Sequence, residues 1–299
     1  MPRLRSAPKN VSEAIPLNFV AYKVGMTHAG ITDDSESPSK NTEISVACTF
    51  LEVPRVEVYG ARFYKKDNNG YKHANIEICK NIKSTTDRPD DYESRINQVK
   101  DKINDFSNIT ALMVAYPKGL SVEQHHKMRF ESELGGTIED KFNFVRSRIG
   151  KEVKLSELFK NGEFVNITTI TKGKGWQGTI KRFGTARLYH KATNKVRQVG
   201  TLGPFTPGKV LFTVPQAGQL GFNYRTEYNK RILKIGSGLN ATSINRASGF
   251  ANYGNIKNDY VIIKGSVGGP AKRLVRIRKS ESRNAKGIKE PKVNYIYAG

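Results

Sequence analysis

Acidic residues are missing from the middle of this sequence: between Phe164 and Thr226 it contains no aspartate and no glutamate. Lysines and arginines are frequent there, at positions Lys172, Lys174, Lys181, Arg182, Arg187, Lys191, Lys195, Arg197, Lys209 and Arg225. Soluble proteins normally mix both charge signs on their surface. A glycine-rich stretch that repels itself is therefore best explained by a polyanionic partner whose condensed counterions it displaces.

The charge bias is regional. Residues 33–163 carry 21 lysines and arginines against 22 aspartates and glutamates, a net charge of −1. The rest of the chain supplies +24, which accounts for the whole formal charge of +23. A solvated charged face explains most basic stretches of proteins, but this asymmetry favours contact with nucleic acid.

Long apolar runs, a secretion signal and cysteine clusters are also missing. No apolar run reaches the roughly 18 residues of a membrane span, so none is predicted. The first ten residues are basic without an apolar segment, which argues against a secretory signal and predicts a cytosolic protein. Cys48 and Cys79 lie far apart in strand-like settings, so we expect buried free thiols rather than a disulfide or a metal site.

Catalytic, metal and cofactor motifs give weak signals. His125 and His126 lack a cysteine or acid at ligand spacing, so no metal site is predicted. Residues 173–178 fit the pattern GxGxxG, but the next segment is too short for a Rossmann helix and the first acid downstream is Glu227. We therefore predict no dinucleotide site. Spacing alone neither assembles nor excludes a Ser-His-Asp triad, although the basic region has almost no acid to serve as a general base.

Hydrophobic periodicity predicts a β-rich first part followed by α/β elements. Alternation and short apolar runs predict strands at residues 17–26, 43–53, 56–64 and 73–79. Helices are predicted at residues 90–106, at 121–134, from 137 with Phe142, Val145 and Ile149 as the core stripe, and at 155–160. Together with a strand at 109–115, these helices predict an α/β insertion in a β-rich body.

Strands are predicted again at residues 164–171, 210–214, 260–264 and 274–278. Residues 172–209 have few apolar side chains and many glycines, which is typical of a functional or disordered loop; we favour a long loop or hairpin. Phe205 lies at a Gly- and Pro-rich apex, where stacking on a base and packing on its own loop explain it equally well. Phe212 lies in a predicted strand, so we expect it in the core.

Four segments of the basic region carry a specific family resemblance. They are residues 171–184 (TKGKGWQGTIKRFG), 202–207 (LGPFTP), 214–221 (VPQAGQLG) and 225–231 (RTEYNKR). In order and spacing they resemble the signature of the universal L3 family of large-subunit ribosomal proteins, of the archaeal and eukaryotic type. Residues 22–28 (YKVGMTH) and 264–276 (KGSVGGPAKRLVR) extend the resemblance, which is weak in the insertion.

The resemblance implies a mainly β fold: a six-stranded β-barrel of the translation-protein type with an inserted α/β domain and a long basic loop extension. In the family this extension threads through ribosomal RNA toward the peptidyl-transferase centre. Its tip carries an aromatic residue, often Trp, which is matched here by Phe205 without an indole N–H. Thr193 stands where eukaryotic members have a histidine, so no histidine chemistry is expected there.

The domain organisation follows from the predicted elements and the resemblance. It comprises a basic N-terminal arm (1–14), the first part of the barrel (15–84), the α/β insertion (85–162), a barrel strand (163–171), the RNA-threading extension (172–209), and the second part of the barrel with a basic C-terminal tail (210–299). The arm is shorter than the archaeal pattern, so the RNA contacts that it makes in the family are not carried over.

We therefore predict a structural constituent of the large ribosomal subunit, located in the cytoplasm, that helps to assemble and support the region around the peptidyl-transferase centre. Its expected partners are large-subunit ribosomal RNA and neighbouring ribosomal proteins, without a membrane, small-molecule substrate, cofactor, metal or catalytic residue. Two rivals are a nucleotide-dependent or RNA-modifying enzyme and a translation factor or RNA chaperone that shares the barrel. The predicted RNA-binding residues are Lys172, Lys174, Lys181, Arg182, Arg187, Lys191, Lys195, Arg197, Phe205, Lys209, Arg225, Lys230, Arg231, Lys264, Lys272, Arg273 and Arg276.

Overall fold

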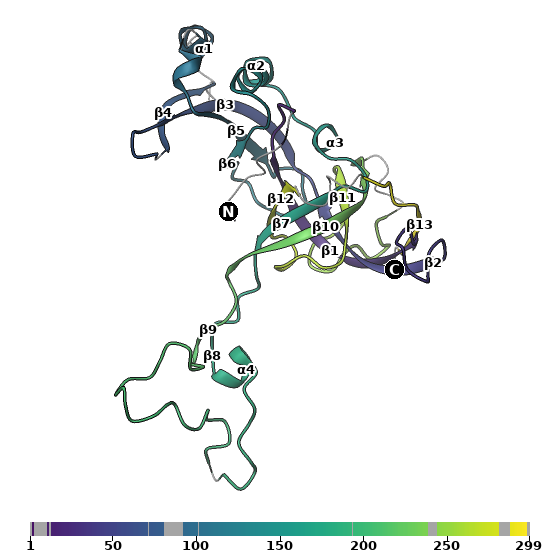
Figure 1. The fold of residues 1–299 in the computed structure, drawn as a ribbon. Helices are drawn as coiled ribbons and strands as arrows, with labels where there is room; N and C mark the ends of the chain where they lie inside the picture. Colours follow the sequence, from purple (N-terminus) through teal and green to yellow (C-terminus); the bar gives the residue numbers. More distant parts are fainter. Residues whose placement is uncertain are drawn as a thin grey trace. The chain divides into compact units, whose positions relative to one another are not determined.

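The computed structural model of the chain describes residues 2, 11, 13–70, 72–80, 92–100, 102–192, 194–238, 244–280 and 288–297. It contains two compact units, one formed by Met1–Thr169 with Thr226–Gly299 and the other by Ile170–Arg225 (Figure 1). Strands dominate the described residues, so the expectation of a mainly β protein is confirmed. Most of the predicted N-terminal arm, and Thr193, lie outside the described residues.

The larger sheet holds seven of the described strands. They are β1 (Asn18–Thr32), β2 (Glu43–Glu52), β7 (Phe164–Ile170), β10 (Tyr224–Gly236), β11 (Tyr260–Lys264), β12 (Leu274–Lys279) and β13 (Val293–Ile296). Their order is β12-β7-β10-β11-β2-β1-β13, and β1 also pairs antiparallel with β12 from Asn18 opposite Arg278 to Tyr22 opposite Leu274. The first half of β1 is buried on both faces, which explains its continuous apolar run.

A second sheet has four strands in the order β4-β3-β5-β6: β3 (Arg55–Lys66), β4 (Lys72–Cys79), β5 (Asn108–Tyr116) and β6 (Met128–Glu133). Helices α1 (Tyr92–Lys100) and α2 (Ile138–Arg148) lie against this sheet, where the Phe63 ring packs on the rings of Phe106 and Phe142 (Figure 1). The predicted strand 56–64 therefore pairs both with the strand predicted for the α/β insertion and with the strand 73–79, in a sheet separate from that of β1 and β2.

Local signals predicted two of the helices correctly. Thr137 and Asp140 form a reciprocal capping box at the start of α2, and Phe142 and Val145 are buried on its inner face. The short helix α3 (Leu155–Leu158) lies where residues 155–160 predicted it. Helix α1 covers the middle of the predicted helix 90–106, whereas Asp90 and Asp91 lie outside the described residues.

The helix predicted at residues 121–134 is wrong, because this segment contains β6. Ser121 donates a hydrogen bond to the backbone oxygen of Asn255 instead of capping a helix, and Glu123 has a φ of 60°. Met128, Phe130 and Ser132 alternate along β6, and Phe130 is buried in the core. Pairing with β5 thus outweighs the local capping pattern.

Two predictions around the basic region also fail. Residues 210–214 form turns and not a strand, with the Val214 N–H bonded to the Leu211 oxygen, and the Phe212 side chain is 97% exposed. The long strand β10 was not predicted, because Lys230, Arg231 and Lys234 interrupt its apolar pattern. Both cysteines are free; Cys48 is buried as expected and Cys79 only half-buried.

Glu52 is a fully buried carboxylate at the end of β2. It accepts hydrogen bonds from the Tyr253 hydroxyl, from the backbone N–H groups of Lys257 (2.8 Å) and Asn258 (2.9 Å), and from the Asn258 amide (3.2 Å). Burial, followed by the Glu52 charge, raises the pKa of Tyr253. The carboxylate thereby fixes residues 253–258 onto the larger sheet.

Arg231 on β10 joins three segments of the larger unit. Its guanidinium pairs bidentately with Asp34, with Nη1 donating to Oδ1 at 2.7 Å, and Nη2 also donates to the Lys289 oxygen at 2.8 Å. The hydrogen bonds from Arg231 lower the pKa of Asp34 below its ordinary 3.8. Because the folded pKa is depressed, the pair stabilises the fold above that ordinary value, and the contribution is lost as pH falls through the folded pKa.

Replacing Glu52 with alanine is expected to lower the free energy of unfolding by about 3 kcal/mol, since buried donors lose their acceptor. Urea unfolding followed by circular dichroism measures the change. Glu36→Ala, at an exposed loop position, is the matched control and should change stability by less than about 0.5 kcal/mol. Equal stability of the two variants would contradict a structural role for Glu52.

Replacing Asp34 with asparagine should cost about 1 kcal/mol at neutral pH, a modest value because the pair is partly exposed to solvent. The difference from the unmodified chain should shrink as pH falls below about 4, where Asp34 itself becomes protonated. Urea unfolding at a series of pH values measures it, with Asp105→Asn, an exposed acid, as control. A difference that stays constant with pH would rule out the ion pair as its cause.

Candidate nucleic-acid interface

The unit Ile170–Arg225 begins with a two-stranded stem, which we define as residues 171–177 and 218–223. The Thr171 N–H donates to the Asn223 oxygen at 3.0 Å, and the Lys174 N–H donates to the Leu220 oxygen at 2.9 Å. Strands β8 (Trp176–Gln177) and β9 (Gly218–Gln219) continue the pairing. The stem is therefore held by backbone hydrogen bonds, which need no particular side chains.

Gly221 is required where the two stem strands approach most closely. Its φ is +73°, and a Cβ built on it would lie 2.0 Å from the backbone oxygen of Lys172. Any other residue would have to displace the opposite strand as well as adopt a left-handed conformation. The glycine thus permits the contact that brings the Lys172 backbone against the returning chain.

A short helix, α4 (Thr179–Phe183), follows the first stem strand. It ends at Gly184, whose φ is 72° and whose N–H bonds to the Ile180 oxygen. This one-turn helix agrees with the argument against a dinucleotide-binding turn, which needs a longer helix at the pyrophosphate. The glycines of residues 173–178 serve the stem and its exit instead.

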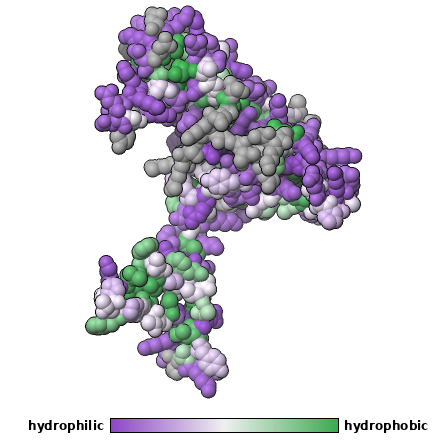
Figure 2. Space-filling view, in the orientation of Figure 1, coloured by the Kyte–Doolittle hydropathy of each residue, from purple (hydrophilic) through white to green (hydrophobic). Residues whose placement is uncertain are grey.

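The unit has almost no interior of its own. Among its described residues only Gly218 is buried, whereas Trp176 is 76% exposed and Phe205 and Phe212 are each 97% exposed. Figure 2 shows apolar residues scattered among polar ones on the surface of this part of the chain. Exposed aromatic rings interleaved with cations are the composition of a surface that stacks on nucleic-acid bases.

Most of the predicted RNA-binding cations of this unit are exposed to solvent. They are Lys172, Lys174, Lys181, Arg187, Lys191, Lys195, Arg197, Lys209 and Arg225. The sequence between Phe164 and Thr226 supplies no carboxylate to neutralise them. Arg182 is less exposed, and its guanidinium donates to the backbone oxygens of Gln216 and Gln219, far along the sequence, whereas Arg225 donates to its neighbour Tyr224.

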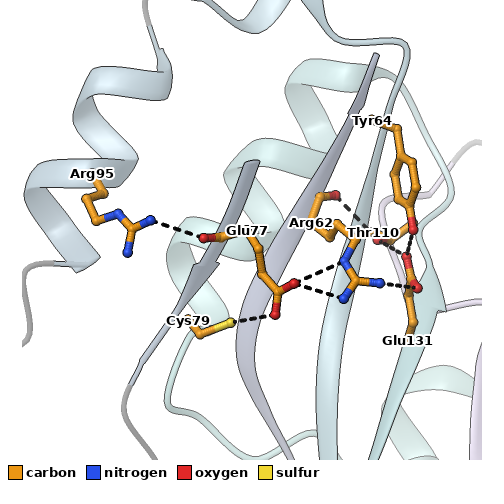
Figure 3. A network of polar contacts seen from close by, with 7 residues as sticks. All are labelled: Arg62, Tyr64, Glu77, Cys79, Arg95, Thr110 and Glu131. Atoms are coloured by element: carbon orange, nitrogen blue, oxygen red, sulfur yellow. Dashed lines mark hydrogen bonds and ion pairs between the residues drawn. The ribbon is translucent and has the colours of Figure 1, made fainter. Parts of the chain in front are cut away.

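The four-stranded sheet has the opposite charge arrangement (Figure 3). Arg62 lies between two carboxylates, 2.8 Å from Glu77 and 3.1 Å from Glu131. The Tyr64 hydroxyl and the Thr110 hydroxyl also donate to Glu131. The bond to Glu77, more than any other contact, raises the pKa of Arg62, and Arg62 in turn lowers the pKa of Glu77. Arg62 is thus neutralised by the protein itself and is not offered to a polyanion.

The structure brings three of the predicted residues in the larger unit together. Lys230, Arg231 and Lys264 line one cavity of about 540 Å³, together with the apolar side chains of Ile44 and Phe164. Lys230 lies 2.8 Å from Glu227, and Arg231 is held by Asp34. Lys264 and Lys289, which also lines this cavity, are both exposed and accessible to a phosphate.

The remaining predicted residues lie on or near β12. Lys272 is 3.4 Å from Glu123, and Arg273 is partly exposed. Arg276 is only 8% exposed; its Nη2 donates at 2.8 Å to both Asn18 Oδ1 and the Glu131 oxygen. Burial lowers the pKa of Arg276 to about 10. A guanidinium bonded in this way supports the packing of β12 and is not positioned to meet a phosphate.

Sequence reasoning missed Trp176 and Phe212 as surface aromatics. Trp176 belongs to a two-residue strand, and Phe212 was assigned to the core because apolar residues surround it. The signal that could have found both is the absence of acids combined with a lack of periodicity, since a segment without a core must expose its aromatic residues. Phe205 is 97% exposed, so of the two explanations left open for it, packing on its own loop is not observed.

Two further features of the described residues concern ligands and membranes. Among them, no group of three or more His, Cys, Asp or Glu side chains is arranged to hold a metal ion. A search of the same residues found no helix with the length and apolarity needed to cross a bilayer.

Comparison with known proteins identifies the family. The model of the family described as ribosomal protein L3 matches residues 61–298. The proteins named large ribosomal subunit protein uL3 from Methanothermobacter thermautotrophicus, Methanosphaera stadtmanae and Methanobrevibacter smithii are 41%, 40% and 42% identical to this chain. Each comparison covers 99% of this chain and 90% of the relative. The chain therefore belongs to the ribosomal protein L3 family.

Proposed function

We propose that this chain is a structural constituent of the large ribosomal subunit, in the cytoplasm, that binds ribosomal RNA and neighbouring ribosomal proteins. The observation that carries the proposal is the unit Ile170–Arg225, in which exposed cations and aromatic rings occur without acids and almost without buried residues. The names of the archaeal relatives support the same subunit. No catalytic residue, cofactor or small-molecule substrate is part of the proposal.

The body of the protein is proposed to be a six-stranded β-barrel of the translation-protein type. The pairings β12-β7-β10-β11-β2-β1, together with the pairing of β1 with β12, support closure of these strands into a ring. A closed ring leaves few unpaired strand edges, so the body can be stable in the absence of RNA. The α/β insertion would then be the part built on the four-stranded sheet.

The basic extension predicted at residues 172–209 falls within the acid-free unit. Its exposed lysines and arginines would neutralise phosphates where RNA helices crowd together, and its glycines would let the backbone run close to the RNA. Phe205 would stack at the tip, near the peptidyl-transferase centre. Lys230, Lys264, Lys272 and Arg273 would add contacts from the body, whereas the buried Arg276 is left out of the proposed interface.

Replacing Lys172, Lys174 and Lys181 together with alanine should flatten the salt dependence of RNA binding. Each lost phosphate contact reduces the slope of log K against log salt by about 0.7–0.9, so the triple variant should lose roughly 2–3 units of slope. Binding to a large-subunit ribosomal RNA fragment at several salt concentrations measures it. Lys65, Lys66 and Lys72, exposed on β3 and β4, give a control variant with the same charge loss. Equal slopes for both triple variants would contradict a specific phosphate-binding role for Lys172, Lys174 and Lys181.

Replacing residues 187–209 with a short Gly-Ser linker should leave the larger unit folded, because none of its core residues lies in this segment. Large-subunit maturation should fail, since the RNA-threading part is lost. Thermal unfolding and sucrose-gradient profiles measure the two effects. The unmodified chain should stay on large subunits in high salt, whereas a translation factor would wash off. Loss of cooperative unfolding in the variant would instead assign the segment to the core.

A further inference from the structure

The guanidinium of Arg182 joins two segments of the acid-free unit that lie far apart in the sequence, whereas that of Arg225 donates to the backbone oxygen of the adjacent residue Tyr224. The Arg182 Nε donates to the backbone oxygen of Gln219 at 3.1 Å, and its Nη1 donates to the backbone oxygen of Gln216 at 2.8 Å. Arg182 lies in α4 on the outgoing chain, whereas Gln216 and Gln219 lie on the returning chain. One side chain thus connects the two ends of the loop 184–215.

The guanidinium of Arg182 lies in a space that is left by the missing side chain of Gly218. A Cβ built on Gly218 would lie 3.0 Å from Nη1 and 3.1 Å from Cζ of Arg182, so any larger residue would push the guanidinium away. Gly218 is also the one buried residue among the described residues of the unit. On its own helix, the guanidinium carbon lies 5.0 Å from the centre of the Phe183 ring, at a cation–π distance.

The chemistry of the site explains why arginine stands here. The unit contains no carboxylate, so neutral acceptors must fix a cation in place, and backbone carbonyls do so for Arg182. The planar guanidinium presents several N–H groups in a rigid fork and can bridge two carbonyls at once. A lysine ammonium is a compact point charge on a flexible stem, so it would hold the two strands together less well.

We propose that Arg182 is a positioning residue that closes the base of the loop 184–215 before RNA binds, and that it is not one of the cations that neutralise phosphates. This inference rests on the proposed function, in which the loop is the part that contacts RNA. The proposal assigns different roles to the two neighbouring residues Lys181 and Arg182. Lys181, one position earlier and exposed, binds phosphate, whereas Arg182 sets the geometry of the stem that carries the loop.

The single tryptophan of the chain provides a direct test, because Trp176 lies in β8 opposite Gln219. Time-resolved fluorescence anisotropy of the full chain without RNA reports the local mobility of Trp176. In Arg182→Ala the slow component should lose roughly half of its amplitude as the stem loosens. Arg182→Lys, which keeps the charge, should lose a similar amount, whereas Lys181→Ala should leave the anisotropy unchanged.

The salt dependence of RNA binding, measured on the same variants, separates the two roles. Lys181→Ala should reduce the slope by about one unit, whereas Arg182→Ala should weaken binding with the slope unchanged. The proposal is overturned if Arg182→Ala lowers the slope as Lys181→Ala does, or if Arg182→Lys retains both the anisotropy and the affinity of the unmodified chain. If Lys181→Ala also leaves the slope unchanged, the proposed phosphate contact fails, and the anisotropy still decides the role of Arg182.

Discussion

Uncompensated positive charge in the unit Ile170–Arg225 is the constraint on which the rest of the structure depends. Two unit charges 10 Å apart repel by about 0.4 kcal/mol in water, and this segment carries many such pairs with no acid to offset them. A hydrophobic core normally outweighs repulsion of this size, but only Gly218 is buried among the described residues of the unit. Its conformation is therefore set by backbone pairing in the stem, by Gly221 and by the Arg182 bridge, all of which work without a core.

The larger unit differs from the acid-free unit in both its charges and its core. Several of its cations are paired with acids of the same unit, as Arg62 is with Glu77 and Glu131, and as Arg231 is with Asp34. Its core is apolar and its buried carboxylate at Glu52 is fully hydrogen-bonded. Since β7 leads into the stem and β10 leads out of it, two neighbouring strands of a stable sheet anchor both ends of the segment that cannot fold on a core. The body can therefore carry a segment that has almost no core of its own.

The sequence revealed the charge segregation, because charge is a property of composition and needs no three-dimensional contacts. It also predicted most strands of the body and helix α2, where alternation and the Thr137 capping box act locally. The sequence-based prediction failed at residues 121–134 and at Phe212, because both outcomes depend on contacts with distant parts of the chain. Residues 128–133 form a strand because they pair with β5, and Phe212 is exposed because no core lies near enough to cover it. The same limit applies to the candidate site. By composition alone, Lys181, Arg182 and Arg276 are all cations that could bind RNA. In the structure Lys181 is exposed, Arg182 bridges two backbone segments and Arg276 is buried.

Phe205 and Phe212 extend this argument to the partner. Both rings are 97% exposed, so folding of the chain alone buries neither of them. Burial of apolar surface contributes roughly 25 cal/mol for each Å², and the two rings do not yet gain this free energy. Glycines and cations would be enough to follow an RNA backbone by charge. Aromatic rings at these positions gain free energy only by burial against a partner, and RNA offers base faces for this purpose. Because Phe205 has no indole N–H, the RNA contact proposed for it would rest on stacking and shape rather than on a hydrogen bond from the ring.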